Sequence, residues 1–218
     1  QKFDDAIEAC LSLLETYPRS GILNITLGKC YFELGQMELA KSSFIKATEY
    51  SPLWNISFVM LGKVYSSQGD LDEAINSYKK SLKIKPGCAE AYYNMGNALM
   101  RKGDLNSAVE SYKKALKTKP DYAEALNNMG LALKDMDDLE AAIKSYKQAL
   151  VIKPDCAETY YNMGNALMSK GDLNSAVESY KKAHKIKPDY AEIVNNMGTA
   201  LKNMGDLEAA IKSYKKAL

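Results

Sequence analysis

Apolar positions along the chain form short stripes with helical spacing. Within residues 89–122, the first stripe consists of Tyr92, Met95, Leu99 and Met100, and the second of Leu105, Ala108, Val109, Tyr112 and Leu116. This spacing places each stripe on one face of a helix. Gly103 lies between the stripes, where a residue in the left-handed conformation commonly ends a helix. The segment therefore predicts two amphipathic helices joined by a tight turn.

Polar residues and prolines predict where these helices begin and end. Asp104 follows the predicted turn and is expected to cap the second helix with its carboxylate. Pro120 is expected to end that helix. Asp121 and Glu124 have the spacing of a capping box, which predicts a side-chain cap for the next helix. Gly96 is expected to let the two helix axes approach closely, because it has no side chain.

The pattern returns every 34 residues along the whole chain. The prolines follow this interval at Pro18, Pro52, Pro86, Pro120, Pro154 and Pro188, and glycines follow it at Gly28, Gly62, Gly96, Gly130, Gly164 and Gly198. A column of aromatic residues has the same register at Phe44, Tyr78, Tyr112, Tyr146, Tyr180 and Tyr214. One helix pair cannot bury both of its apolar faces alone, so the repetition predicts stacked neighbours.

This pattern resembles the tetratricopeptide repeat family over the whole chain. The resemblance implies an all-α fold, a right-handed superhelical α-solenoid of helix-turn-helix repeats. The family's first large apolar position holds Phe58, Tyr92, Leu126, Tyr160 and Val194 instead of Trp. We expect one continuous solenoid domain: the second helix of a truncated repeat at 1–20, repeats at 21–54, 55–88, 89–122, 123–156 and 157–190, and a repeat lacking its exit loop at 191–218.

Two of these repeats are almost identical, which indicates recent duplication of a repeat pair. Residues 89–122 and 157–190 differ only at Ala91/Thr159, Arg101/Ser169, Leu116/His184 and Thr118/Ile186. Residues 123–156 and 191–218 also match each other closely, whereas 21–54 and 55–88 are more divergent.

The two ends of the chain carry apolar stripes typical of internal repeat helices. These stripes consist of Phe3, Ile7, Cys10 and Leu14 at the start, and of Leu207, Ala210, Ile211, Tyr214 and Leu218 at the end. We expect the chain to be a segment of a longer protein. Uncovered stripes of this kind favour association, and contact between unlike ends predicts open head-to-tail chains of copies.

Composition excludes several classes of partner. The 218 residues carry 29 Lys+Arg and 27 Asp+Glu, so the net charge of +2 gives no general attraction to nucleic acid or to an anionic membrane. No stretch approaches the roughly 18 consecutive apolar residues of a spanning helix. The four cysteines have neither metal-ligand nor dense disulfide spacing, so we expect a reducing, cytoplasmic location.

The resemblance also implies a binding face, because the first helix of each tetratricopeptide repeat lines the concave surface. The sixth position of four repeats is then an asparagine in the groove: Asn94, Asn128, Asn162 and Asn196. This column resembles the asparagine ladder in the superhelical repeat region of O-linked N-acetylglucosamine transferase, which grips peptide backbone. An amide offers one donor group and one acceptor, which suits any peptide unit. Further groove contacts are expected from Asn97, Asn165, Tyr93 and Tyr161.

Other features argue against more specific activities. The lysine of the clamp that binds C-terminal carboxylates in related repeats is replaced here by Ile25, Val59, Tyr93, Asn127, Tyr161 and Asn195. Paired lysines on the second helices, such as Lys113 and Lys114, are offset by glutamates on the same helices, so nucleic acid is not an expected partner. The single histidine, His184, replaces a packing residue. We therefore expect no catalytic residue, no metal site and no cofactor.

The sequence thus predicts a protein-protein interaction scaffold that binds an extended peptide or a partner protein in its concave groove. An alternative interpretation is a regulatory or substrate-presenting repeat segment of a larger bacterial enzyme, such as a glycosyltransferase or sulfotransferase. The sequence does not identify the partner, because the fold leaves function open.

Overall fold

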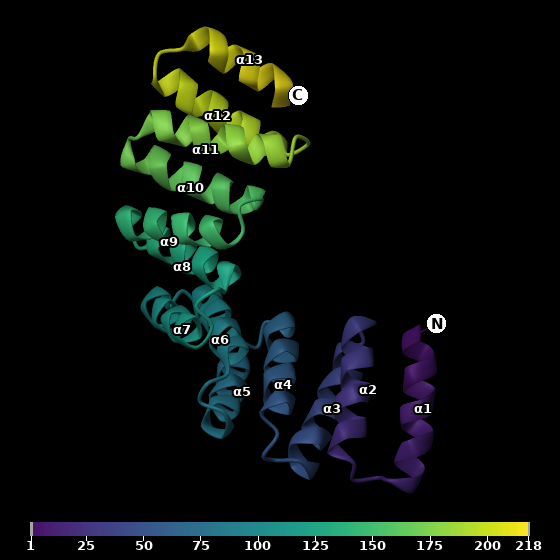
Figure 1. Ribbon diagram of the computed structural model, residues 1–218. Coiled ribbons are helices and arrows are strands. Elements are labelled where there is room, and N and C mark those ends of the chain that lie inside the picture. The colour runs from purple at the N-terminus through teal and green to yellow at the C-terminus, as the bar shows by residue number, and fades with distance from the viewer. Residues whose placement is uncertain (1, 218) are drawn as a thin grey trace. The chain divides into compact units, whose positions relative to one another are not determined.

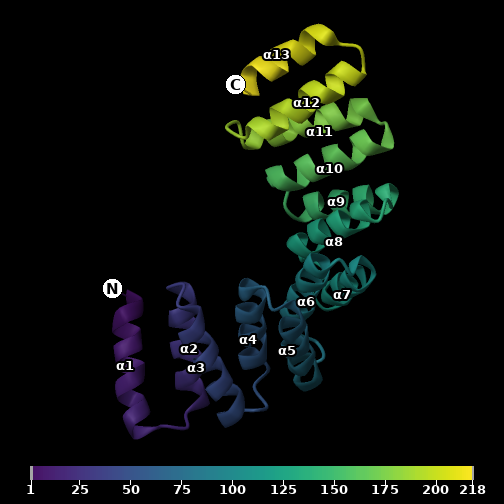
Figure 2. The ribbon, with the colours of Figure 1, turned by 180° about the vertical axis from the view of Figure 1, so that it is seen from behind.

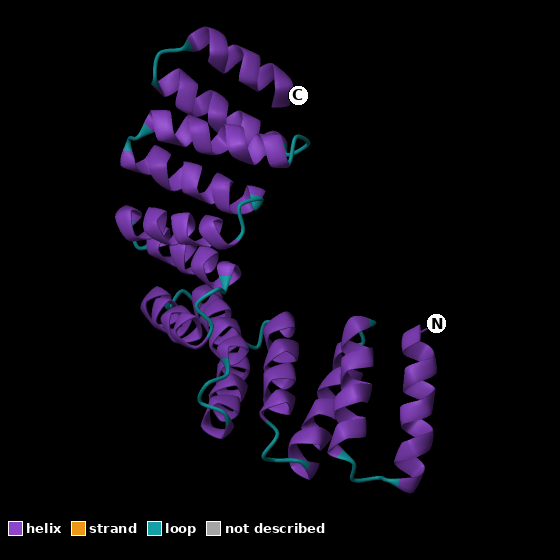
Figure 3. Ribbon diagram, in the orientation of Figure 1, coloured by secondary structure: helices purple, strands orange, loops and turns teal. Residues whose placement is uncertain are grey.

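The computed structural model describes residues 2–217, which form thirteen α-helices and no strand (Figures 1 and 3). The first helices of the repeats are α2 (Gly21–Glu33), α4 (Asn55–Gln68), α6 (Ala89–Lys102), α8 (Ala123–Asp135), α10 (Ala157–Lys170) and α12 (Ala191–Asn203). The second helices are α1 (Lys2–Thr16), α3 (Met37–Tyr50), α5 (Leu71–Ile84), α7 (Leu105–Thr118), α9 (Leu139–Ile152), α11 (Leu173–Ile186) and α13 (Leu207–Ala217).

The helices belong to two compact units. Unit 1 contains α1 to α7, and unit 2 contains α8 to α13. Within each unit, every helix packs against the one that follows it, so that α8 with α9, α10 with α11 and α12 with α13 form successive layers of unit 2 (Figure 2). The predicted fold class, an all-α solenoid of helix-turn-helix repeats, is confirmed. The boundaries given for individual repeats stay a proposal.

The two helices of a repeat approach each other where a glycine faces an aromatic ring. A Cβ atom added to Gly96 would lie 2.6 Å from Cε1 of Tyr112, which is closer than side chains pack. The other five glycine–aromatic pairs give 2.5 to 2.7 Å. Glycine destabilises a helix interior by about 1 kcal/mol relative to alanine. Here it is required because the buried ring occupies the space of a Cβ.

The turns between the helices of a repeat need a backbone with positive φ. Glycine supplies it at Gly35, Gly69, Gly103, Gly171 and Gly205, with φ between 73° and 90°. The predicted left-handed conformation at Gly103 is therefore confirmed. The equivalent residue between α8 and α9 is Asp137, with φ of 63°, and it is the only described non-glycine residue with positive φ.

Side chains cap several of the helices, but not the one for which the capping box was predicted. Asp104 accepts a hydrogen bond of 3.1 Å from the backbone N–H of Ser107, which confirms the predicted cap. The capping box at Asp121 and Glu124 is wrong, because Tyr122 is the N-cap residue of α8 and makes no side-chain cap. Asp121 therefore lies one residue before the position from which a carboxylate caps a helix.

The predicted apolar stripes at the two ends are only partly exposed. On α1, Cys10 is buried, and the exposed apolar side chains include Leu11 and Leu13, each 47% accessible. The prediction that Cys10 belongs to an uncovered stripe is wrong, because its side of α1 packs on α2. On α13, Leu207 and Ile211 are exposed as predicted, and Leu218 lies outside the described residues.

Candidate peptide-binding face

The predicted asparagine column lies on the first helices α6, α8, α10 and α12. All four side chains, Asn94, Asn128, Asn162 and Asn196, are half-buried rather than fully exposed. They therefore do more than solvate a helix surface. In unit 2 the column forms part of a hydrogen-bonded network that joins successive first helices.

Asn196 on α12 joins this network through both of its amide hydrogens. Its Nδ2 donates to the hydroxyl of Tyr161 at 3.0 Å and to Oδ1 of Asn165 at 3.1 Å, and both acceptors lie on α10. An asparagine amide has two hydrogens to donate. The donors of Asn196 are thus fully used, and its Oδ1 has no partner among the described residues.

Glu192 holds two tyrosine hydroxyls beside Asn196. It accepts from Tyr161 at 2.6 Å and from Tyr190 at 2.9 Å, and these two donors lower the pKa of the Glu192 carboxyl. The rings of Tyr161 and Tyr190 lie 5.7 Å apart with a tilted geometry typical of aromatic pairs. The ammonium group of Lys187 lies 4.7 Å from the centre of the Tyr190 ring. These contacts fix Tyr161 in place at the start of the face.

Asn162 on α10 is linked to α8 in a similar way. Its Nδ2 donates to Oδ1 of Asn127 at 3.3 Å, and Nδ2 of Asn127 donates to Oδ1 of Asn128 at 3.2 Å. Asn127 is 7% accessible, so it belongs to the helix–helix contact more than to the surface. Oδ1 of Asn162 has no hydrogen-bond partner in the part of the chain that the structure describes.

Asn97 and Asn165, which were expected to extend the face, each contact the core of their own repeat. Oδ1 of Asn97 accepts from the hydroxyl of buried Tyr112 at 2.7 Å, and Oδ1 of Asn165 accepts from Tyr180 at 2.7 Å. Through their Oδ1 atoms, these two asparagines therefore join the two helices of their own repeats.

In unit 1 the corresponding residues of α6 have other contacts. Tyr93 packs against the Tyr112 ring with centres 6.2 Å apart. Nδ2 of Asn94 is buried and has no hydrogen-bond partner among the described residues. The sixth position of the preceding repeat is the buried Met60. A buried amide donor without a partner is costly unless a ligand or water satisfies it.

Three residues of this network were not predicted from the sequence: Asn127, Tyr190 and Glu192. One signal for Asn127 is present, because it shares the fifth repeat position with Tyr93 and Tyr161. Tyr190 and Glu192 lie two residues apart at the start of α12, and no sequence rule brings them to the hydroxyl of a tyrosine on α10.

Neither a metal site nor a membrane span accompanies this face. The described residues contain no group of three or more His, Cys, Asp or Glu side chains that could hold a metal ion. None of their helices has both the length and the apolar character needed to cross a membrane.

Comparison with known families identifies the repeats. A family model described as "TPR repeat" matches residues 62–103, 96–137, 132–171 and 164–205, and one described as "Tetratricopeptide repeat" matches residues 23–52. The chain belongs to the tetratricopeptide repeat family. A separate comparison with curated proteins found no match.

Solved structures of tetratricopeptide repeat proteins resemble the chain over most of its length. The crystal structure of MamA is 34% identical, with a TM-score of 0.70 over 72% of this chain and 92% of MamA. YrrB, described as a TPR protein with an unusual peptide-binding site, is 24% identical over 82% of this chain and 92% of its own, with a TM-score of 0.70. PilF of Pseudomonas aeruginosa is 20% identical over 98% of this chain and 90% of its own, with a TM-score of 0.77.

Proposed function

We propose that this tetratricopeptide repeat chain is a protein-interaction scaffold, without catalytic residues of its own, that binds an extended peptide along the face formed by α8, α10 and α12. The residues proposed for contact in unit 2 are Asn128, Asn162, Asn196 and Tyr161. Asn94 and Tyr93 on α6 are proposed as peptide contacts within unit 1. Asn97 and Asn165 would contact the peptide only through their side-chain NH2 groups, because their Oδ1 atoms accept hydrogen bonds from core tyrosines.

The open carbonyl groups of Asn162 and Asn196 carry this proposal. The network within the protein uses both amide hydrogens of Asn196 and one of Asn162, so each residue offers its carbonyl oxygen as an acceptor at one-repeat spacing. Peptide N–H groups are the donors that any extended segment supplies, whatever its side chains. Because the network holds the asparagines in place beforehand, binding would cost little side-chain entropy.

Hydrogen bonds from the column alone give weak binding. Each contributes about 0.5–1.5 kcal/mol, whereas micromolar affinity requires about 8 kcal/mol. The rings of Tyr161 and Tyr190 supply apolar contact area beside the column, which suits a ligand with an aromatic or aliphatic side chain. The peptide-binding site in the description of YrrB, a protein of the same fold, supports this function.

Alanine substitution tests the proposal. Replacing Asn162 and Asn196 with alanine should weaken binding across most peptides on an array, because backbone contacts are shared by all of them. The matched control replaces Asn106 and Asn174, exposed asparagines at the starts of the second helices α7 and α11. Circular dichroism verifies that helicity is retained. Equal peptide profiles for the two double variants would rule out binding through the column.

Location and further partners also belong to this proposal. All four cysteines are free thiols, which supports a reducing, cytoplasmic location. Ion pairs such as Glu110–Lys113 at 2.8 Å offset the lysines of the second helices, which argues against nucleic acid as a partner.

Exposed Leu207 and Ile211 on α13 and Leu11 on α1 support head-to-tail self-association. Light scattering over a range of concentrations tests it, and a constant monomer mass would reject it.

A further inference from the structure

The outer face of α9 departs from the pattern of its sister helices. On α7 and α11, a glutamate precedes a lysine by three residues and pairs with it: Glu110 with Lys113 at 2.8 Å, and Glu178 with Lys181 at 2.7 Å. On α9 the glutamate position holds Lys144, so Lys147 has no such partner. In the described residues neither Lys144 nor Lys147 forms an ion pair. Two lysines without an ion-pair partner among the described residues therefore lie together on this helix.

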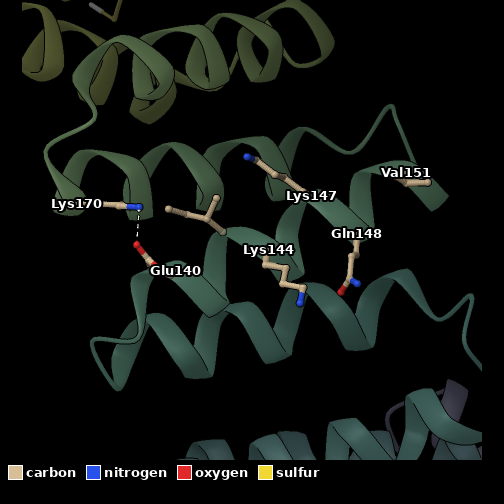
Figure 4. A pocket seen from close by; sticks show the side chains of 7 residues that line it. Glu140, Lys144, Lys147, Gln148, Val151 and Lys170 are labelled. Carbon is tan, nitrogen blue, oxygen red and sulfur yellow. Dashed lines mark hydrogen bonds and ion pairs between the residues drawn. The ribbon is translucent and has the colours of Figure 1, made fainter.

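These two lysines line an open depression of about 480 Å³, which we name the lysine depression (Figure 4). Its lining consists of Glu140, Ile143, Lys144, Lys147, Gln148 and Val151 from α9, and Lys170 from the end of α10. Lys170 pairs with Glu140 at 3.0 Å. Three ammonium groups thus face a single carboxylate in the lining.

A neighbouring carboxylate does not remove this excess of charge. Asp172 lies close enough to Lys147 and Lys170 for their charges to lower the pKa of its carboxyl. The main cause of that lowering is Ser175 in the first turn of α11, whose backbone N–H donates to the N-cap residue Asp172 at 3.2 Å. The Asp172 carboxylate keeps its charge, so two carboxylates, Glu140 and Asp172, stand against the three ammonium groups of Lys144, Lys147 and Lys170, and an excess of positive charge remains.

The depression also has an apolar side chain that the sister helices lack. Val151 is 82% accessible, and the equivalent positions of α7 and α11 hold Lys117 and Lys185. An isolated valine in place of a lysine gives a ligand an apolar contact next to the positive charges. The outer face of α9 therefore differs from those of α7 and α11 both in its charged side chains and in its exposed apolar side chain.

We propose that the lysine depression binds an acidic segment of a partner protein, with its carboxylates at Lys144 and Lys147 and an apolar side chain on Val151. Charge complementarity selects this occupant. A nucleic acid would need positive charge that continues along the surface, and the next second helix, α11, has its Lys181 neutralised by Glu178. The site lies on a second helix, so it is separate from the asparagine column and gives the scaffold a second binding surface.

Fluorescence anisotropy with two labelled peptides tests this assignment. One peptide alternates Glu with Leu, and the other alternates Lys with Leu. We expect the acidic peptide to bind and the basic peptide not to bind. Affinity should fall when salt is raised, because exposed charges are screened within a Debye length of about 10 Å or less.

Matched variants separate a local site from the general charge of the protein. Lys144→Glu restores the sister-helix pattern and should weaken binding by about tenfold or more, since it both removes a charge and pairs Lys147. Lys147→Gln should also weaken binding, whereas Lys181→Gln, the same change at the equivalent position of α11, should alter it by less than about twofold. All three positions are exposed, so the variants should keep the fold, which circular dichroism verifies.

Several results would overturn the proposal. Equal losses in Lys147→Gln and Lys181→Gln would indicate a diffuse electrostatic attraction, and stronger binding of the basic peptide would contradict the charge argument. Sedimentation of the chain alone gives a further check, because α1 has an acidic face containing Asp4, Glu8 and Glu15. Self-association that Lys144→Glu abolishes would identify a second copy, and not a separate partner, as the occupant.

Discussion

The hydroxyl of Tyr180 donates a hydrogen bond of 2.7 Å to Oδ1 of Asn165, across the two helices of one repeat. Tyr112 and Asn97 form the same bond at the same length. In the repeat that contains α8 and α9, the asparagine position holds Leu131, and the buried hydroxyl of Tyr146 has no hydrogen-bond partner among the described residues. Burial raises the pKa of the Tyr146 hydroxyl, so it stays protonated as an unused donor. Helix pairs with the same repeat architecture thus differ in one polar contact of the core.

Substitution of these tyrosines by phenylalanine should therefore have different effects. Tyr180→Phe removes a hydrogen bond that is formed in the folded state and leaves Oδ1 of Asn165 with only the donor from Asn196, so the free energy of unfolding should fall by about 1 kcal/mol. Tyr146→Phe removes only an unsatisfied hydroxyl and should leave stability unchanged or slightly higher. Urea denaturation of both variants measures the difference. A loss for Tyr146→Phe as large as that for Tyr180→Phe would show that the hydroxyl finds a partner in solution.

The turn at Asp137 offers a stabilising substitution. Its φ of 63° is left-handed, and five of the corresponding turns use glycine. Asp137→Gly relieves the strain between Cβ and the backbone but makes the unfolded chain more flexible, so the net gain should be less than about 1 kcal/mol. Thermal unfolding measures it, with Gly171→Asp as the reverse change in a sister turn. Clear destabilisation by Asp137→Gly would contradict this explanation.

His184 should be replaceable by the residue of its sister repeat. Its Nδ1 is buried without a hydrogen-bond partner among the described residues, and position 116 of the sister repeat is a leucine. His184→Leu removes the unsatisfied nitrogen and adds apolar contact, so the free energy of unfolding should rise by about 1 kcal/mol. Leu116→His is the converse variant and should lower it. If His184→Leu destabilises the protein, a water or partner must satisfy Nδ1.

The features that sequence predicts here are those that depend on local structure. Gly103 ends its helix and Asp104 caps the next one because both effects act within a few residues. The capping box at Asp121 failed by a single residue, since Tyr122 takes the cap position. The network around Glu192 could not be predicted, because it depends on how far apart α10 and α12 lie. The position of Asn196 on the face was predictable by repeat register, whereas the use of both its amide hydrogens was not.

The carboxylate of Glu192 should make stability depend on pH. The hydroxyls of Tyr161 and Tyr190 hold the pKa of the Glu192 carboxyl below its ordinary value of 4.5. A lowered pKa in the folded state stabilises the protein above the unfolded-state pKa, and the contribution disappears as pH falls through the lowered value. The difference in melting temperature between the wild type and Glu192→Gln should therefore be largest above about pH 5 and shrink below about pH 4.

Glu158→Gln is the matched control, because Glu158 occupies the same position in the preceding repeat and accepts no tyrosine hydrogen bond within the described residues. A difference for Glu192→Gln that stays constant from pH 3 to pH 7, measured by thermal unfolding, would mean that packing and not charge explains the effect.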